Sequence, residues 1–322
     1  MKLWSSFARS GAAPIAISIL AVGMLLAPMA RADDERQLVE SKESLYNNIY
    51  VYKQGDDYAM TFGYNRKIYT ESIYNSKDDR DLPVVYTRYM TAALIYPKDV
   101  HSILEIGFGG GRTSWYLHRF LPGVSVTSVE LDPDVEALAK KYFGVKDEPN
   151  FHLVNQDGRL FLQQSKDKYD IILIDAYRGP FVPFHLLTKE FYQLVKDHLA
   201  PGGAVGQNVE PSTMLFDSAV KTIQSVFPQA DFYLAEGNVV TIAYDGPPRE
   251  PSDLEKSAKQ RQLELNLRYQ LPAMLAQRRG LDPTTLDASA KVLTDDFAPV
   301  EALKAIENHN RKWPDRQPSG SP

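Results

Sequence analysis

The chain has 322 residues with 36 basic and 41 acidic side chains, and its formal net charge at pH 7 is −5. It contains no cysteine, which excludes disulfide cross-links, thiolate catalysis and cysteine-ligated zinc, and its six histidines lack the close pairing of a metal site. The acidic balance disfavours nucleic acid as a partner, because a basic surface supplies most of that affinity.

The first 32 residues have the pattern of a secretory signal peptide. Lys2 and Arg9 precede an uncharged apolar run, and Ala30-Arg31-Ala32 has the small-x-small pattern of a signal-peptidase site. The apolar core, residues 15–27, is shorter than the about 20 residues that a spanning helix needs, which argues against an uncleaved membrane anchor. We therefore expect cleavage before Asp33 and export to the bacterial periplasm or the medium.

Residues 33–82 are predicted to form a small antiparallel β-domain. Apolar and polar residues alternate in the period-two manner of strands through residues 44–75. Gln54-Gly55-Asp56-Asp57 and Gly63-Tyr64-Asn65 are turn signals between the expected strands. The three strands predicted on this basis are residues 49–52, 58–62 and 67–70.

Residues 83–245 are predicted to form a doubly wound α/β domain, because strand-like and helix-like segments alternate. A helical segment at 84–95 comes first. The strand-like runs are 102–106, 124–129, 151–154, 169–174 and 204–209, and the helical ones are 112–120, 133–143, 159–164, 188–198 and 211–226. The last two strands, 231–234 and 239–244, are joined by a short turn and must be antiparallel. A mostly parallel sheet with a reversed last strand is the mark of the methyltransferase-type Rossmann fold.

The remaining residues are expected to form a helical extension and a tail. Gly246-Pro247-Pro248 begins a linker, and residues 253–279 are charged and helical, with an interruption at Pro272. We assign the extension to 246–309. Residues 310–322 are polar, contain three prolines and are predicted to be disordered.

A glycine-rich segment carries the most specific functional signal. The strand-like run 103–106 leads into four glycines between residues 107 and 111, and a helix-like segment follows. Glycines let a chain turn sharply from strand into helix and let a ligand approach bare backbone. Glu130 ends the next strand-like run about 20 residues later, where an acid can accept both hydroxyls of a ribose. Gly107, Gly109, Gly111 and Glu130 therefore form a candidate nucleoside-binding site.

Four acids occur at the carboxyl ends of predicted parallel strands, where ligands bind in open α/β sheets. Glu130 would hold the ribose, and Glu105 would lie near an ammonium group of the ligand. Asp157 would either face the adenine amino group or cap the following helix. Asp175 would orient or deprotonate a reacting amine. Residues 177–187, rich in aromatic residues and proline, would form a lid or a packed connection.

At these residues the chain, from about Glu43 to Tyr244, resembles the spermidine synthase family of polyamine aminopropyltransferases. The family has a small N-terminal β-domain ahead of a methyltransferase-like domain. The motifs that carry the resemblance are residues 103–111, 129–132, 156–159, 169–175, 187–192 and 199–203. Residues 182–190 and 293–300 are similar to the spermidine-synthase-like domain that bacteria often fuse to a membrane transporter.

Three departures from the family pattern concern the amine substrate. Spermidine synthases usually have an aspartate within the glycine loop, where it meets the aminopropyl ammonium, and this chain has Gly110. Spermidine synthases also have a second aspartate, thought to be the base, three residues after the aspartate that corresponds to Asp175. In this chain that position is Arg178. The usual Tyr-His-Glu is replaced by Tyr86-Thr87-Arg88. A cation opposite a polycationic substrate opposes binding.

The resemblance implies a transferase that uses S-adenosylmethionine or its decarboxylated form as a substrate, without a metal. Asp175 would orient the acceptor amine for aminopropyl transfer, at an amine site that has lost part of its acidic character. One alternative is an exported, non-catalytic protein that binds a nucleoside or polyamine, or acts with a partner. Another is an S-adenosylmethionine-dependent methyltransferase. Besides these small molecules, the expected partners are a second copy of the chain and a membrane protein.

Overall fold

The computed structural model describes residues 35–64, 67–179, 181–211, 213, 215–265, 267–280 and 286–296. These residues belong to one compact unit that begins at Glu35. The expected signal peptide, residues 1–32, and the expected tail, 310–322, lie outside the described residues. Within the described residues, no helix combines the length and apolar character needed to cross a bilayer.

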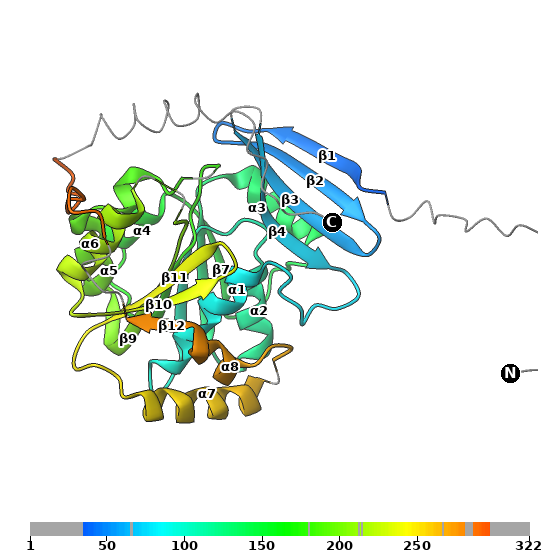
Figure 1. The fold of residues 1–322 in the computed structure, drawn as a ribbon. Coiled ribbons are helices and arrows are strands. Elements are labelled where there is room, and N and C mark those ends of the chain that lie inside the picture. Colours follow the sequence, from blue (N-terminus) through cyan, green and yellow to red (C-terminus); the bar gives the residue numbers. More distant parts are fainter. Residues whose placement is uncertain are drawn as a thin grey trace, which may run out of the picture. The chain divides into compact units, whose positions relative to one another are not determined.

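The N-terminal part forms a four-stranded antiparallel sheet in the order β1-β2-β3-β4 (Figure 1). Its strands are β1 (Gln37–Glu43), β2 (Asn48–Gln54), β3 (Asp57–Tyr64) and β4 (Lys67–Asn75). One face is apolar and packs on helix α3 (Pro133–Tyr142), where Ile49 and Met60 meet Val135. The sequence analysis missed β1, because nearly all of its side chains are exposed and no apolar alternation marks it.

The main sheet has eight strands among the described residues, in the order β12-β10-β11-β9-β8-β5-β6-β7. The five strands from β9 to β7 are parallel, whereas β11 is antiparallel to β9 and β10 is antiparallel to β11. The methyltransferase-type Rossmann fold is therefore confirmed. The strands are β5 (Ser102–Ile106), β6 (Ser125–Glu130), β7 (Phe151–Asn155), β8 (Tyr169–Ile174), β9 (Leu199–Val209), β10 (Gln229–Ala235), β11 (Asn238–Tyr244) and β12 (Arg278–Gly280).

Helices cover both faces of this sheet, which explains the almost continuous apolar strands. One face packs on α1 (Val85–Met90), α2 (Arg112–Phe120) and α7 (Pro251–Leu265), and the other packs on α4 (Gly158–Gln164), α5 (Lys189–Asp197) and α6 (Phe216–Val226). Neighbouring residues of β5 divide between the two cores, with Ile103 in the first and Leu104 in the second. The sheet is thus sandwiched, and the edge at the carboxyl ends of its parallel strands is left for a ligand.

Two predicted helices differ from the observed elements. The segment 84–95 forms α1 and then a 3₁₀ helix, η2 (Thr91–Ile95), and the helix predicted at 211–226 begins only at Phe216. Two further 3₁₀ turns occur at η3 (Phe184–Leu186) and η4 (Leu275–Gln277). Boundaries of this kind depend on tertiary contacts as well as on local propensity.

The C-terminal segment corrects the prediction of one interrupted helix over 253–279. After α7 the chain forms a short helix, α8 (Leu271–Met274), with a proline in its first turn, then η4 and then strand β12. Strand β12 pairs with β10, and Arg278 Nε lies 3.0 Å from Asp231 Oδ2. Asp231 is buried and also accepts a hydrogen bond of 2.8 Å from Tyr96. The ion pair between Arg278 and a buried carboxylate thus adds to the backbone pairing of β12 at the edge of the sheet.

Candidate functional site

A pocket of about 710 Å³ lies at the carboxyl ends of strands β5, β6 and β8, and strand β4 of the small sheet forms part of its wall. This volume is in the usual range for small-molecule sites. Six of the seven candidate residues line it, namely Glu105, Gly107, Gly109, Glu130, Asp157 and Asp175. Residues 181–187 of the expected lid also line it. Gly111 is instead the N-cap of α2, with φ of 69°.

The glycine loop brings the end of β5 against the end of β8. Gly107 has φ of 91°, and a Cβ atom there would lie 2.4 Å from the Asp175 carbonyl oxygen. Gly111 is equally constrained, because a Cβ atom would lie 2.2 Å from the Phe108 ring. Only glycine fits these two positions without a clash. Close approach of the two strand ends is what brings Asp175 beside the loop.

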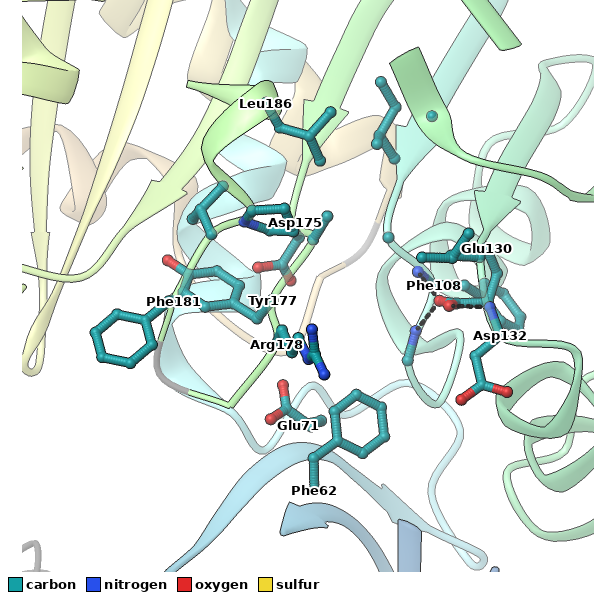
Figure 2. Close-up of a pocket in the computed structure, with 18 of the residues that line it drawn as sticks. Phe62, Glu71, Phe108, Glu130, Asp132, Asp175, Tyr177, Arg178, Phe181 and Leu186 are labelled. Atoms are coloured by element: carbon teal, nitrogen blue, oxygen red, sulfur yellow. Dashed lines mark hydrogen bonds between the residues drawn. The ribbon is translucent and has the colours of Figure 1, made fainter. Parts of the chain in front are cut away.

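Glu130, at the end of β6, fastens the glycine loop through its carboxylate. Its Oε2 accepts hydrogen bonds from the backbone N–H groups of Phe108 at 2.9 Å and Gly109 at 3.3 Å (Figure 2). Its Oε1 accepts one from the N–H group of Asp132 at 2.9 Å. Burial raises the pKa of Glu130, although these three donors act in the opposite direction. A carboxylate can accept about four hydrogen bonds, so Glu130 can accept a further one from a ligand hydroxyl.

Glu105, in β5, is nearly inaccessible at 2% exposure. Its Oε2 accepts a hydrogen bond of 3.0 Å from the Ser128 hydroxyl. Burial raises the pKa of Glu105 to about 8. The carboxyl group is therefore mostly protonated at neutral pH and supplies little negative charge for a ligand ammonium.

Asp157 is the N-cap of α4, as one of its two predicted roles required. Its Oδ1 accepts hydrogen bonds from the N–H groups of Arg159 at 2.9 Å and Leu160 at 3.0 Å. Its Oδ2 lies 2.8 Å from His185 Nε2, which belongs to the expected lid. This hydrogen bond to His185 is the main cause of the lowered pKa of Asp157. Contact of Asp157 with an adenine group remains a prediction.

Asp175, directly after β8, is held by groups from two other elements. Its Oδ1 accepts a hydrogen bond of 3.1 Å from the side-chain amide of Asn208, which in turn accepts one of 2.9 Å from Asn238. The Tyr86 hydroxyl also hydrogen-bonds to Asp175. Burial raises the pKa of Asp175 to about 6. Asp175 is therefore an oriented carboxylate with a pKa suited to accepting a proton near neutral pH.

Glu71, on β4, is the most informative pocket residue that the sequence analysis missed. It lines the pocket together with Phe62 of β3, and Figure 2 shows both below Asp175. Burial raises the pKa of Glu71 well above its usual value, and the charges of Asp175 and Glu130 act in the same direction. A polar residue in an alternating strand is ordinary, so nothing in the sequence marked Glu71 as a site residue.

The three departures from the family pattern have different surroundings. Arg88 does not line the pocket, since its Nε donates to the Leu82 carbonyl at 2.6 Å and its Nη2 lies 3.4 Å from Asp81. Arg178 does line the pocket, and its N–H group donates to the Phe181 carbonyl oxygen at 2.8 Å. Of the two arginines, only Arg178 is therefore placed where it could repel a cationic amine substrate, as the sequence predicts.

The side of the loop at Gly110 is filled by other residues. The Gly110 N–H group donates to Ser72 Oγ at 3.0 Å. A Cβ atom at position 110 would lie 2.6 Å from Ser72 Cβ and 2.8 Å from the Phe143 ring. A longer side chain could not occupy this position without displacing them.

Comparisons with known proteins agree with the fold described above. Residues 85–238 match the family model described as spermine/spermidine synthase domain. A polyamine aminopropyltransferase from Vibrio vulnificus is 28% identical over 304 residues, which cover 90% of this chain and 99% of the relative. A crystal structure of a probable spermidine synthase from Corynebacterium glutamicum has a TM-score of 0.65 at 18% identity and covers 82% and 98% of the two chains. A spermidine synthase in complex with the transition-state analogue AdoDATO has a TM-score of 0.59 at 22% identity, covering 75% and 84%.

Proposed function

Because the chain carries a spermine/spermidine synthase domain and is a homologue of polyamine aminopropyltransferases, we propose that it binds a sulfonium nucleoside and transfers an aminopropyl group to an amine. The donor is decarboxylated S-adenosylmethionine, with S-adenosylmethionine as the alternative. The observation that carries the proposal is that residues of the glycine loop, Glu130 and Asp175 line one pocket. A structural neighbour that holds AdoDATO supports the choice of ligand.

In this proposal the two ends of the pocket have separate tasks. Glu130 and the glycine loop bind the ribose, and Asp175 orients the acceptor amine. The amine nitrogen attacks the carbon beside the sulfonium, a C–N bond forms, and the C–S bond breaks with its electron pair going to sulfur. The proton lost by the nitrogen passes to Asp175. The sulfonium is a good leaving group, so the protein contributes mainly by positioning.

The proposed acceptor site differs from a typical diamine-binding site at one position. Arg178 replaces the expected base, and an arginine cannot act as a base near neutral pH because its pKa exceeds about 12. We therefore propose that transfer to putrescine is very weak. Arg178→Asp should increase it if this one substitution is what silences the reaction.

The test is to incubate the purified protein with decarboxylated S-adenosylmethionine and a panel of amines, and to follow release of the thioether nucleoside. Arg178→Gln serves as the matched control for Arg178→Asp, because it removes the cation without adding an acid. Turnover of putrescine by the unaltered protein near roughly 1 s⁻¹, the low end for enzymes, would contradict the proposed defect.

The nucleoside half can be tested by binding alone. Hydrogen bonds to a charged group contribute about 1.5–3 kcal/mol, so Glu130→Ala should weaken methylthioadenosine binding at least about tenfold. Glu136→Ala is the control, because Glu136 lies on α3, pairs with Lys140 and does not line the pocket. Equal affinities of Glu130→Ala and the unaltered protein in calorimetry would remove the assignment.

A second candidate is an exported, non-catalytic binding protein. The observation that favours it is that two acids usual in spermidine synthases are absent: Arg178 lines the pocket at one of these positions, and Gly110 stands in the glycine loop at the other. This protein would bind the nucleoside or a polyamine without turnover. Tight methylthioadenosine binding together with no transfer to any amine of the panel would select this candidate.

A further inference from the structure

We propose that Glu71 binds the ammonium group of the donor's three-carbon chain and thereby selects a decarboxylated sulfonium nucleoside over one with an α-carboxylate. This inference rests on the proposed function and deepens it, because it assigns the choice of donor to a residue of the small sheet. Glu71 would be a specificity-determining residue, separate from the ribose-binding Glu130 and from Asp175 at the reacting end.

The position of Glu71 in the pocket is the first support. Its side chain lines the same pocket as Asp175 and Glu130. A bound nucleoside would extend from its ribose at Glu130 to its reacting carbon at Asp175. Figure 2 shows Glu71 below Asp175, on the wall contributed by β4, so the three-carbon chain of the donor would extend beyond the reacting carbon toward Glu71.

The filled space at Gly110 is the second support. A side chain at that position would meet Ser72 and Phe143, so the loop itself offers no carboxylate to the donor chain. Ser72 directly follows Glu71 in β4, and its hydroxyl accepts a hydrogen bond from the Gly110 N–H group. The hydrogen bond between Gly110 and Ser72 thus fixes β4 beside the glycine loop, while the neighbouring Glu71 lines the pocket.

The charge around Glu71 is the third support. Its strongest electrostatic neighbours are Asp175, Glu130 and Glu210, all of which are acids. Among the described residues, Glu71 takes part in neither an ion pair nor a hydrogen bond with a basic side chain. Acids outnumber arginines among the residues that line the pocket, and such a charge balance favours a cationic ligand. A ligand α-carboxylate at the same place would be repelled.

Arg178 is the residue that could oppose this selection. It lines the same pocket, its side chain is exposed, and a guanidinium can bind a carboxylate in a bidentate manner. If Arg178 rather than Glu71 governed the donor chain, the protein would favour the ligand with the α-carboxylate. The two possibilities therefore predict opposite orders of affinity.

The experiment measures dissociation constants by calorimetry for three unreactive thioethers. Methylthioadenosine has no charged chain, S-adenosyl-3-thiopropylamine carries an ammonium, and S-adenosylhomocysteine carries an ammonium and a carboxylate. We expect the unaltered protein to bind the thiopropylamine at least about tenfold more tightly than either of the others, which is the effect of one charge-assisted hydrogen bond.

The diagnostic variant is Glu71→Gln, which keeps the shape of the side chain and removes the carboxyl group that a bound ammonium would hold in its ionised form. It should lose the preference for the thiopropylamine and keep its affinity for methylthioadenosine within about threefold, which also shows that the variant is folded. Glu43→Gln is the control, because Glu43 is an exposed acid on β1 of the same sheet. It should behave like the unaltered protein.

Two results would overturn the inference: an unchanged preference in Glu71→Gln, or tighter binding of S-adenosylhomocysteine than of the thiopropylamine by the unaltered protein. Absence of methylthioadenosine binding by the unaltered protein would instead refute the proposed function. The two failures are therefore distinguishable.

Discussion

At the scale of residues, the pocket shows how the surroundings of a carboxyl group change its pKa. Glu105 is enclosed by the sheet and its pKa is raised to about 8, whereas hydrogen bonds from His185 and from the α4 backbone lower the pKa of Asp157. Asp175 is intermediate, at about 6. Distinct protonation states of neighbouring acids are typical of sites that bind or transfer protons.

The raised pKa of Glu105 predicts a dependence of stability on pH. Between its usual value of 4.5 and about 8, the folded state binds a proton that the unfolded state has released. The free energy of unfolding should therefore decrease with rising pH in this window, with a slope approaching about 1.4 kcal/mol per pH unit. Glu105→Gln should remove this contribution and be more stable than the parent above about pH 8.

Urea unfolding of both proteins at several pH values measures this difference. Asp170→Asn is unsuitable as a control, because Asp170 accepts hydrogen bonds from the backbone of His101 and Ser102. Glu43→Gln is suitable, because Glu43 is exposed. Parallel pH profiles for Glu105→Gln and the parent would show that Glu105 is ionised in the folded protein.

Asp175 predicts the pH dependence of the proposed transfer. The ionised carboxylate is the form that orients the amine and accepts its proton, so kcat/KM should fall as the pH decreases through about 6. Asp175→Asn should reduce the rate by about 10²- to 10⁴-fold and remove this acid limb. A limb that persists in Asp175→Asn would assign it to another group, such as Glu71 or the substrate itself.

At the scale of elements, the described residues 286–296 connect the C-terminal part to the expected lid. The Leu293 N–H group donates to Thr222 Oγ1 of α6 at 2.9 Å, and its carbonyl oxygen accepts from the Lys189 N–H group at 2.8 Å. Asp295 forms a two-point ion pair with Arg159 of α4. Arg159 also donates to the His185 carbonyl oxygen at 3.1 Å, so the segment supports the wall of the pocket through one guanidinium.

Asp295→Asn should therefore loosen the lid as well as lower stability. Loss of a partly exposed two-point ion pair should cost about 1 kcal/mol, because such pairs contribute little in water. Amide hydrogen exchange should become faster at residues 184–187, which surround the His185 carbonyl group that Arg159 holds. The matched control is Asp296→Asn, whose side chain is also exposed. Unchanged exchange at these residues would show that the lid is independent of the segment.

At the scale of the whole molecule, the small sheet completes the pocket of the larger domain. Phe62 and Glu71 come from β3 and β4, and the other acids come from the carboxyl ends of the parallel strands. The packing of Ile49 and Met60 on α3 holds the two sheets together. The N-terminal region is therefore part of the proposed binding site.

Export is the remaining proposal at this scale. The charged start, apolar core and Ala30-Arg31-Ala32 predict that the mature protein begins at Asp33 and carries a net charge of about −8, from 33 basic and 41 acidic side chains. N-terminal sequencing of the native protein, with Ala32→Leu to block cleavage as the control, checks this. Recovery of protein that begins at Met1 from a membrane fraction would contradict it.

The sequence by itself determined the order of strands and α-helices from β2 to β11, the fold class and four acids of the pocket. Apolar runs such as 103–106 and 169–174 mark buried parallel strands, and the strand boundaries at β5 and β8 agree with those predicted. These features are local, because a strand or a turn is encoded by the residues that form it. For the same reason the glycine loop could be identified before any contact was known.

Tertiary structure alone decided which distant residues share the site. Glu71 and Asp175 are separated by about 100 residues and line one pocket because β4 lies beside the glycine loop. Arg88 lies outside this pocket, where Leu82 and Asp81 are its partners. Strand β12 pairs with β10, and its Arg278 forms an ion pair with the buried Asp231. Burial and charge depend on neighbours from other elements, so the state of Glu105 and the proposed role of Glu71 could be derived only from the folded chain.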